Sequence, residues 1–411
     1  MLFKKNTLNI SINFKKVIFL NLFFSSILLS AQGFQDYGLG GGLKVQSRDY
    51  NYAFQLGGAI QPKILISSAS GELNSRFSPE LTFLRLQGYA LKEKLSFFIQ
   101  SDYSRNDLLM DAWLSYAPLK TLKFTFGQML NVGNNREMLF YEDQLCFADR
   151  GLLSSGYSMT GREMGIKIES QYQIGISGLH PQIMITTGDG RNSFGTDSRD
   201  VDLGGYKYSF RLDLTPFGDF SEENKAFTAD LAFENRMKVL LGFAGSYNFG
   251  ASGSFGESHG DFTLYRNDGE ALPDYRKWYL DALIKYRGGS LLLEMGQATA
   301  TSLIGLRHSP VASDVLFPEE ISGYLALGTG YSAMGEIMMN KKISISSSHS
   351  IIYPEFGNYS NGIFVATSQT RFGMNYYRSG HNAKFNIGYS LFRNENDFQE
   401  NRISLIFQVR I

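Results

Sequence analysis

The sequence predicts an all-β protein, a transmembrane, antiparallel, up-and-down β-barrel of about 16 strands. Three observations predict this fold class. Short segments whose apolar and polar side chains alternate recur along the 411 residues. For most of the chain, short links between these segments alternate with longer ones. The final segment, residues 402–411, is itself of this kind, so we expect it to pair with the first strand and close the sheet.

The alternation is clearest in residues 206–215. One face of this segment is apolar and carries Tyr206, Tyr208, Phe210, Leu212 and Leu214. The other face is polar and carries Lys207, Ser209, Arg211, Asp213 and Thr215. Because strand side chains point to opposite faces with period two, such a segment separates an apolar medium from a polar one. A membrane strand needs only about 9–11 residues, so an average hydrophobic content is compatible with a membrane barrel.

Sixteen segments of this kind follow one another along the chain. They are residues 52–67, 81–91, 95–105, 110–118, 121–129, 163–170, 173–187, 206–215, 238–248, 277–287, 290–298, 321–332, 342–351, 369–378, 383–393 and 402–411. Residues 68–80 are expected to form a polar loop, and residues 226–236 are compatible with either a turn or a strand. Short turns at one end and longer loops at the other are typical of outer-membrane barrels. Two places break the pattern, namely the brief second outer link and the stretch from residue 216 onward.

The long link 130–162 is the third on the side of the longer loops. It separates the strand at 121–129 from the strand at 163–170 and is rich in charge. We expect this third outer loop to fold inward and narrow the lumen.

The N-terminus predicts export from the cytoplasm. Residues 1–31 combine four lysines with an apolar stretch and a small-residue exit, as a signal peptide does. Residues 32–51 are then a periplasmic lead-in, and residues 52–411 form the barrel. Removing the signal leaves 35 basic against 39 acidic residues, because it carries four of the 39 lysines and arginines and no acid. The mature chain is mildly acidic and shows no basic stripe for nucleic acid.

The sequence offers little for catalysis or metal binding. The single cysteine, Cys146, excludes an intramolecular disulfide and a Cys-x-x-Cys metal site. Residues 256–260 match the pattern G-x-S-x-G but lie in a Gly/Ser-rich loop without the strand–turn–helix context of a nucleophile elbow. The acidic cluster Asp189, Asp197, Asp200 and Asp202 is expected to be a solvated or lipopolysaccharide-facing loop. We therefore expect no enzyme activity, no cofactor and no metal.

Residues 81–170 resemble the phosphate-selective porins called O and P of Gram-negative outer membranes. The segments that carry the resemblance are residues 83–86, 111–116, 122–128, 149–151 and 161–165. The resemblance implies a sixteen-stranded, trimeric porin in the outer membrane, in contact with lipid and lipopolysaccharide, whose third outer loop enters the lumen. Residues 130–162 occupy the place of that loop.

Charged residues of this loop and of the inward strand faces are the candidates for the pore lining and constriction. They are Arg136, Glu142, Asp143, Asp149, Arg150, Arg162, Arg85, Lys123, Lys207 and Arg211. The loop itself is slightly acidic, whereas basic residues lead by a small margin on the strand faces. Selectivity needs charges of one sign at the constriction, so this mixed lining predicts weak selectivity, on the side of anions if any, and phosphate specificity is not carried over.

The sequence thus predicts a passive diffusion channel for small hydrophilic solutes or ions. The alternative is a non-channel outer-membrane barrel with a structural or hydrolytic role. A barrel of about 16 strands favours the channel, because narrower barrels fill with side chains. A secreted β-sandwich or adhesin is a further alternative, which membrane fractionation separates from a barrel.

Overall fold

A computed structural model describes residues 34–147, 149–193, 204–258, 260–357 and 359–411. Within these residues, nineteen strands form one antiparallel sheet, and sixteen of them close into a ring. The ring strands are β3 (Ala53–Ala69), β4 (Glu72–Ala90), β5 (Leu95–Asp102), β6 (Leu109–Leu119), β7 (Leu122–Leu130), β8 (Arg162–Ser170), β10 (Ser177–Thr186), β11 (Lys207–Thr215), β12 (Lys238–Asn248), β15 (Asp274–Tyr286), β16 (Gly289–Thr301), β17 (Gly328–Met338), β18 (Ile343–Pro354), β19 (Thr367–Tyr377), β20 (Ala383–Asn394) and β21 (Gln399–Arg410). The expected signal peptide, residues 1–31, lies outside the described residues and stays a prediction.

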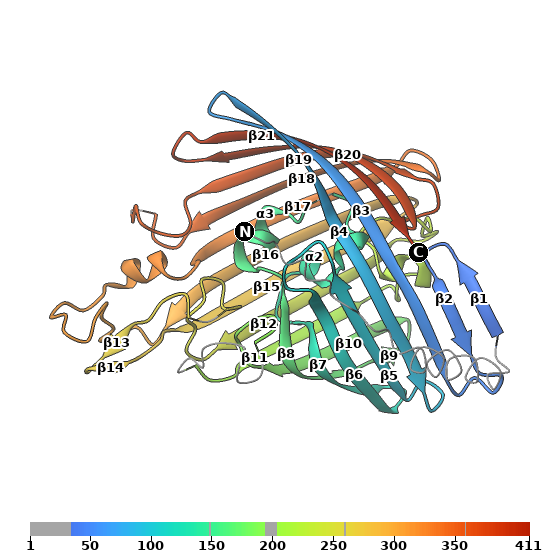
Figure 1. The fold of residues 1–411 in the computed structure, drawn as a ribbon, viewed down its shortest axis with the longest axis horizontal. Helices are drawn as coiled ribbons and strands as arrows, with labels where there is room; N and C mark the ends of the chain where they lie inside the picture. The colour runs from blue at the N-terminus through green and yellow to red at the C-terminus, as the bar shows by residue number, and fades with distance from the viewer. Residues whose placement is uncertain (1–33, 148, 194–203, 259, 358) are drawn as a thin grey trace, which may run out of the picture.

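The last strand closes the ring against the first, as expected. In the register of β21 with β3, Ile403 faces Ile66 and Leu405 faces Ile64. Figure 1 shows this seam, where the blue β3 and β4 lie beside the red β20 and β21. Closure leaves no unpaired edge in the ring, which a wall in an apolar medium requires.

Three short strands extend the sheet outside the ring. β1 (Phe34–Gly38) and β2 (Gly42–Gln46) form a hairpin, and β2 pairs with β3 beyond the end of β21. The expected lead-in therefore contains ordered strands. β9 (Tyr172–Ile174) follows β8 and pairs with β10, while β13 (Tyr265–Arg266) and β14 (Gly269–Glu270) form a separate small hairpin.

The two faces of the wall differ as the alternation predicts. Along β11, the outward side chains of Tyr208, Phe210 and Leu212 are exposed, whereas the inward Arg211 and Asp213 are buried. The polar face thus lines the barrel interior, and the apolar face covers its outside.

Two expected elements are wrong. Residues 68–80 are not a loop, because β3 and β4 continue into a hairpin whose turn, Ser70 and Gly71, has positive φ at both residues. Such a two-residue turn matches the twist of paired strands, and strands that project beyond the barrel need no apolar face. Residues 321–332 are not one strand either. They span the end of the 3-10 helix η2 (Pro318–Gly323) and the start of β17, and buried Ile321 and Leu325 belong to a packed link.

The links define two ends of the barrel. The end with the long links 131–161, 249–273 and 302–327 is called the outer end, and the opposite one the inner end. Most inner links are short, such as 120–121, 287–288 and 339–342. The exception is the link 216–237, which contains α4 (Glu222–Lys225) and no strand, so it is not the strand that residues 226–236 allowed. No helix among the described residues is long and apolar enough to cross a membrane.

Candidate functional site in the barrel interior

The link 131–161 folds into the barrel and reaches the opposite wall, which confirms the expected inward loop. It contains α2 (Arg136–Leu139), η1 (Glu142–Gln144) and α3 (Leu152–Tyr157). At the far side, Lys384 Nζ of β20 donates a hydrogen bond to the Leu145 carbonyl at 2.6 Å, and Asn386 Nδ2 donates to the Cys146 carbonyl at 3.2 Å. In Figure 1, α2 and α3 lie within the ring of strands. The interior is therefore the candidate site, and the loop 131–161 divides it.

The first half of the loop is held by a network of two arginines and two aspartates. Arg136 of α2 donates to Asp281 at 2.9 Å and to Asp213 at 3.0 Å. Arg211 of β11 donates to the same Asp213 at 2.9 Å, also binds Asp281, and donates to the carbonyl of Asn134 at 3.0 Å. The four charged side chains are almost fully buried. Charges of both signs alternate here, so this network fixes the loop and is electrically balanced.

A second network holds the middle of the loop. Arg162, at the start of β8, donates to Asp111 of β6 at 2.9 Å and to Glu142 of η1 at 2.8 Å. Arg150 donates to the carbonyls of Glu137 and Phe140 at 2.6 and 2.8 Å and lies 3.3 Å from the Glu142 carboxylate. Burial alone would raise the pKa of Glu142, but the Arg162 and Arg150 guanidinium groups hold it well below its usual value.

A third network joins the loop to the seam of the barrel. The Asp143 carboxylate accepts two hydrogen bonds from Arg85 of β4 at 2.7 and 2.8 Å, and Arg410 Nε of β21 lies 2.7 Å away. Burial would raise the pKa of Asp143, but Arg85 and Arg410 together lower it well below its usual value. Two arginines share one carboxylate, so this network carries one net positive charge.

The other predicted pore residues lie at both ends of the interior. Asp149 accepts from Lys63 Nζ at 2.5 Å near the outer end, and its side chain is 45% exposed. Lys207 Nζ lies 2.6 Å from Glu163 and is buried. Lys123 pairs with Glu169, and the Lys123 side chain is 41% exposed.

Each of the ten predicted pore residues forms an ion pair. The structure brings nine of them into the barrel around the loop 131–161, while Lys123 lies apart on the wall. Their assignment as the constriction stays a prediction.

Sequence reasoning missed several residues that anchor the loop. Glu257 accepts the backbone N–H groups of Met159 at 2.8 Å and Gly161 at 3.1 Å, so a residue of the G-x-S-x-G match holds the end of the loop. Glu137 accepts from the backbone N–H of Gly151 at 2.8 Å and lies 3.4 Å from Arg371. The sequence could have indicated Arg371, because it lies at an inward position of a strand with alternating side chains. It could not have indicated Glu257, because Glu257 lies in a loop without periodicity.

Sequence reasoning also missed two hydrophobic clusters inside the barrel. The cluster nearer the outer end joins Leu153 and Tyr157 of α3 to residues of the links 249–273 and 302–327. The other cluster contains Phe140, Cys146 and Phe147 of the loop together with Phe220 of the inner link. Burial raises the pKa of the Cys146 thiol and so favours its protonated form. Much of the lumen is filled by packed loop residues.

A polar cavity of about 180 Å³ lies against the seam. It is lined by Gly40, Gly41, Gln55, Gly57, Gly58, Arg85, Gln87, Phe98, Tyr141, Gln144, Arg410 and Ile411. The side chain of Arg85 is 19% exposed, whereas Arg162, Arg211 and Lys207 are buried to within about one per cent. This cavity is thus polar and lies beside the ends of β3 and β4 and the seam.

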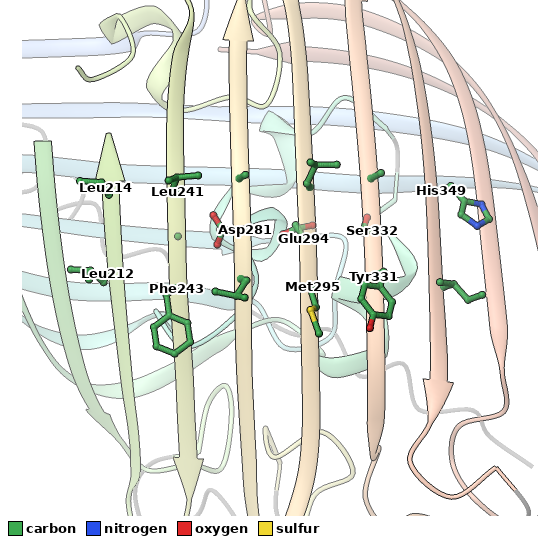
Figure 2. Close-up of a pocket in the computed structure, with 16 residues that line it drawn as sticks. Leu212, Leu214, Leu241, Phe243, Asp281, Glu294, Met295, Tyr331, Ser332 and His349 are labelled. Carbon is green, nitrogen blue, oxygen red and sulfur yellow. The ribbon is translucent and has the colours of Figure 1, made fainter. Parts of the chain in front are cut away.

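A larger depression, of about 740 Å³, lies on the outside of the wall. Figure 2 shows its two rows of outward side chains across β11 to β18, among them Leu212, Phe243 and Tyr331. Asp281 and Glu294 lie between the rows at the level of the wall but bond to loop residues on the inside. This depression is apolar and belongs to the surface that faces the surrounding medium.

The described residues contain no group of three His, Cys, Asp or Glu side chains placed to hold a metal ion. Three members of the predicted acidic cluster, Asp197, Asp200 and Asp202, fall outside the described part of the chain.

No known protein-family model and no curated protein matches this chain. The structure is similar to that of the outer membrane channel DcaP of Acinetobacter baumannii, with 11% identity, 89% of this chain and 99% of that chain covered, and a TM-score of 0.54. It is also similar to Salmonella typhi OmpF, solved in complex with daunomycin, with 11% identity, 92% and 100% coverage and a TM-score of 0.52. The chain therefore has the closed, sixteen-stranded fold of porins.

Proposed function

We propose that this chain is a porin in the outer membrane of a Gram-negative bacterium, a passive diffusion channel for small hydrophilic solutes or ions. The closed sixteen-stranded ring, with a charged interior and an inward loop, carries the proposal. Rings of about 16 strands leave space for an aqueous channel. The apolar outside suits contact with lipid and lipopolysaccharide. The channel needs no cofactor, because no covalent chemistry takes place.

The proposed path runs along β3 and β4, between the wall and the loop 131–161. Its outer part is marked by Asp149 and Glu80, whose side chains are 45% and 25% exposed. Its inner part is the polar cavity beside Arg85 and Arg410. The opposite half of the interior, around Arg211, is packed and ion-paired, so solutes would pass on the seam side only. Such a path is narrow and predicts a small conductance.

The charges along this path predict weak selectivity. Three basic side chains, Lys63, Arg85 and Arg410, stand beside three acidic ones, Glu80, Asp143 and Asp149. Only a ring of charges of one sign would select strongly. Membership in the phosphate-selective porins O and P remains a proposal that rests on the resemblance of residues 81–170. We do not propose phosphate specificity for this chain.

Assembly as a homotrimer is also a proposal that rests on this resemblance. The apolar wall across β11 to β18 offers a continuous outward surface, with Phe243 and Leu280 among its exposed side chains. Lipid or a second copy of the chain would cover it.

The second candidate is a barrel that does not conduct and has a structural role. The observation that favours it is the packing of the lumen, since two hydrophobic clusters occupy the space that water fills in an open channel. A hydrolytic role has less support, because Ser258 of the G-x-S-x-G match donates to Asp261 at 2.8 Å, and no helix starts between it and β15 among the described residues.

Swelling of proteoliposomes tests the proposed function. Liposomes that contain the folded protein are diluted into isosmotic solutions of sugars of increasing size. We expect swelling that is fast for a pentose and slows steeply for disaccharides, because the path is narrow. Liposomes without protein are the control. Swelling no faster than in this control, with the protein shown to be folded and inserted, would favour the non-conducting barrel.

A further inference from the structure

The inner link 216–237 also folds into the barrel, on the side opposite the entry of the loop 131–161. The link follows β11 and joins β12 at Lys238. Near its start, Gly218 has a φ of 83°, a backbone conformation that favours glycine. Between these points it contacts strands and turns around much of the inner end. A turn between adjacent antiparallel strands needs only a few residues, so its length has another cause.

A buried lysine holds the centre of this link. Lys285 of β15 points into the barrel and is 0% exposed. Its ammonium group donates to three carbonyl oxygens of the link, those of Asn224 at 2.8 Å, Phe227 at 2.6 Å and Ala229 at 2.9 Å. It also lies 4.8 Å from the centre of the Phe220 ring. All donors of this ammonium group are therefore used to fix the link.

An aromatic contact holds the link at the far wall. The Phe227 ring stacks on the His381 ring of the β19–β20 turn, with centroids 4.1 Å apart and planes within 2°. The Arg410 guanidinium of β21 lies 5.4 Å from the centre of the same Phe227 ring. The link thus spans the inner end, from β11 and β12 to β19, β20 and β21.

The link is a folded unit in its own right. Asn224 Nδ2 donates to Asp230 at 2.7 Å and to Glu234 at 2.9 Å. Glu234 accepts from the backbone N–H of Ser221 at 2.7 Å, which joins the two ends of the link. The Gly288 N–H of the β15–β16 turn donates to Asp230 at 2.7 Å. The bonds of Asn224 and Ser221 lie within the link and let it keep its shape, whereas the Gly288 bond ties it to the wall.

We propose that residues 216–237 are an inner plug, a second gate that covers the inner end of the interior and is displaced as a unit when solutes pass. This inference rests on the proposed channel function. The plug is held at Lys285 and Phe227 and by two bonds from the β15–β16 turn, Arg287 N–H to the Glu234 carbonyl at 2.9 Å and Gly288 N–H to Asp230 at 2.7 Å. It supplies no strand to the ring, so it can leave without opening the ring. It shares a hydrophobic cluster with Phe140 and Cys146 of the loop 131–161, so the two inward segments close the interior together.

Two variants loosen the plug and one serves as a matched control. Lys285→Met removes the three ammonium–carbonyl bonds and keeps an apolar stem, and Phe227→Ala removes the stacked ring. Lys225→Met is the control, because Lys225 lies in the plug and its exposed side chain pairs with exposed Glu222 on the plug surface. Heat-modifiable migration on gels shows whether each barrel is folded.

The readout that does not depend on conduction is labelling of the single cysteine by a water-soluble maleimide. Cys146 is 1% exposed and lies in the same cluster as Phe220 of the plug. We expect slow labelling in the wild type and in Lys225→Met, and a severalfold faster rate in Lys285→Met and Phe227→Ala. In planar bilayers we expect the same two variants to show a severalfold larger conductance than the wild type.

The outcomes separate the plug from the proposed function. Unchanged labelling and unchanged conductance in both folded variants, with a conducting wild type, would overturn the plug and leave the porin. Faster labelling with no conductance in any form would overturn the porin and with it the gate, and would show only that residues 216–237 shield Cys146.

Discussion

Replacing Arg162 by methionine should destabilise the folded protein by about 3–5 kcal/mol, because it leaves buried carboxylates without their cation. Among the residues that the structure describes, Arg162 is the sole ion-pair partner of Asp111 and one of two partners of Glu142, and the Arg162 and Asp111 side chains are 0% exposed. An unpaired buried charge is far more unfavourable than the pair it came from. The measurement is urea unfolding of the protein in lipid, with wild type and variant compared.

The control for this variant is Lys123→Met. Lys123 also forms an ion pair, but its side chain is 41% exposed, and pairs in water contribute about 0–1 kcal/mol. Arg136→Met should fall between the two, since Arg211 still contacts both Asp213 and Asp281. Equal stability of the Arg162 and Lys123 variants would mean that the interior is hydrated and that the loop 131–161 is not held by buried charge.

Replacing Asp143 by asparagine should turn the channel towards anions. Asparagine has nearly the same shape, so Arg85 and Arg410 stay in place but lose their shared negative partner. One added unit of charge several ångströms from the path contributes about 1–2 kcal/mol at an effective dielectric near 20, so the anion-to-cation permeability ratio should rise roughly tenfold. The reversal potential in a salt gradient measures this ratio.

Asp314→Asn is the matched control, because Asp314 lies in the outer link 302–327, where its carboxylate accepts from Ser313. Its reversal potential should equal that of the wild type. If the reversal potential of Asp143→Asn also equals that of the wild type, ions do not pass beside Arg85 and the path lies elsewhere.

The wall of the barrel could be predicted because its physics is local. In β11 each side chain meets either the apolar medium or the interior, so period two appears directly in the sequence. The inward loop was predictable from its length and its place in the order of links. The alternation of links also broke from residue 216 onward, which is where the inner plug begins.

The interior could not be predicted, because its contacts join residues that are far apart in sequence. The bond between Asp143 and Arg410 closes a separation of 267 residues, and no local pattern encodes it. Apolar residues of the long links, such as Leu264 and Leu306, show no periodic pattern in the sequence. In the structure they are buried in one cluster with residues of α3. The predicted strand 321–332 was wrong for the same reason. Ile321 is apolar because it is buried in this cluster, and in the sequence such a residue cannot be told from the apolar face of a strand.

The measurement that tests the central claim most directly is the current through single wild-type molecules in a planar bilayer under a salt gradient. A narrow, charge-balanced path predicts small, discrete conductance steps and a reversal potential close to zero. Folded and inserted protein that gives no steps would contradict the diffusion channel and identify the molecule as a closed, structural barrel.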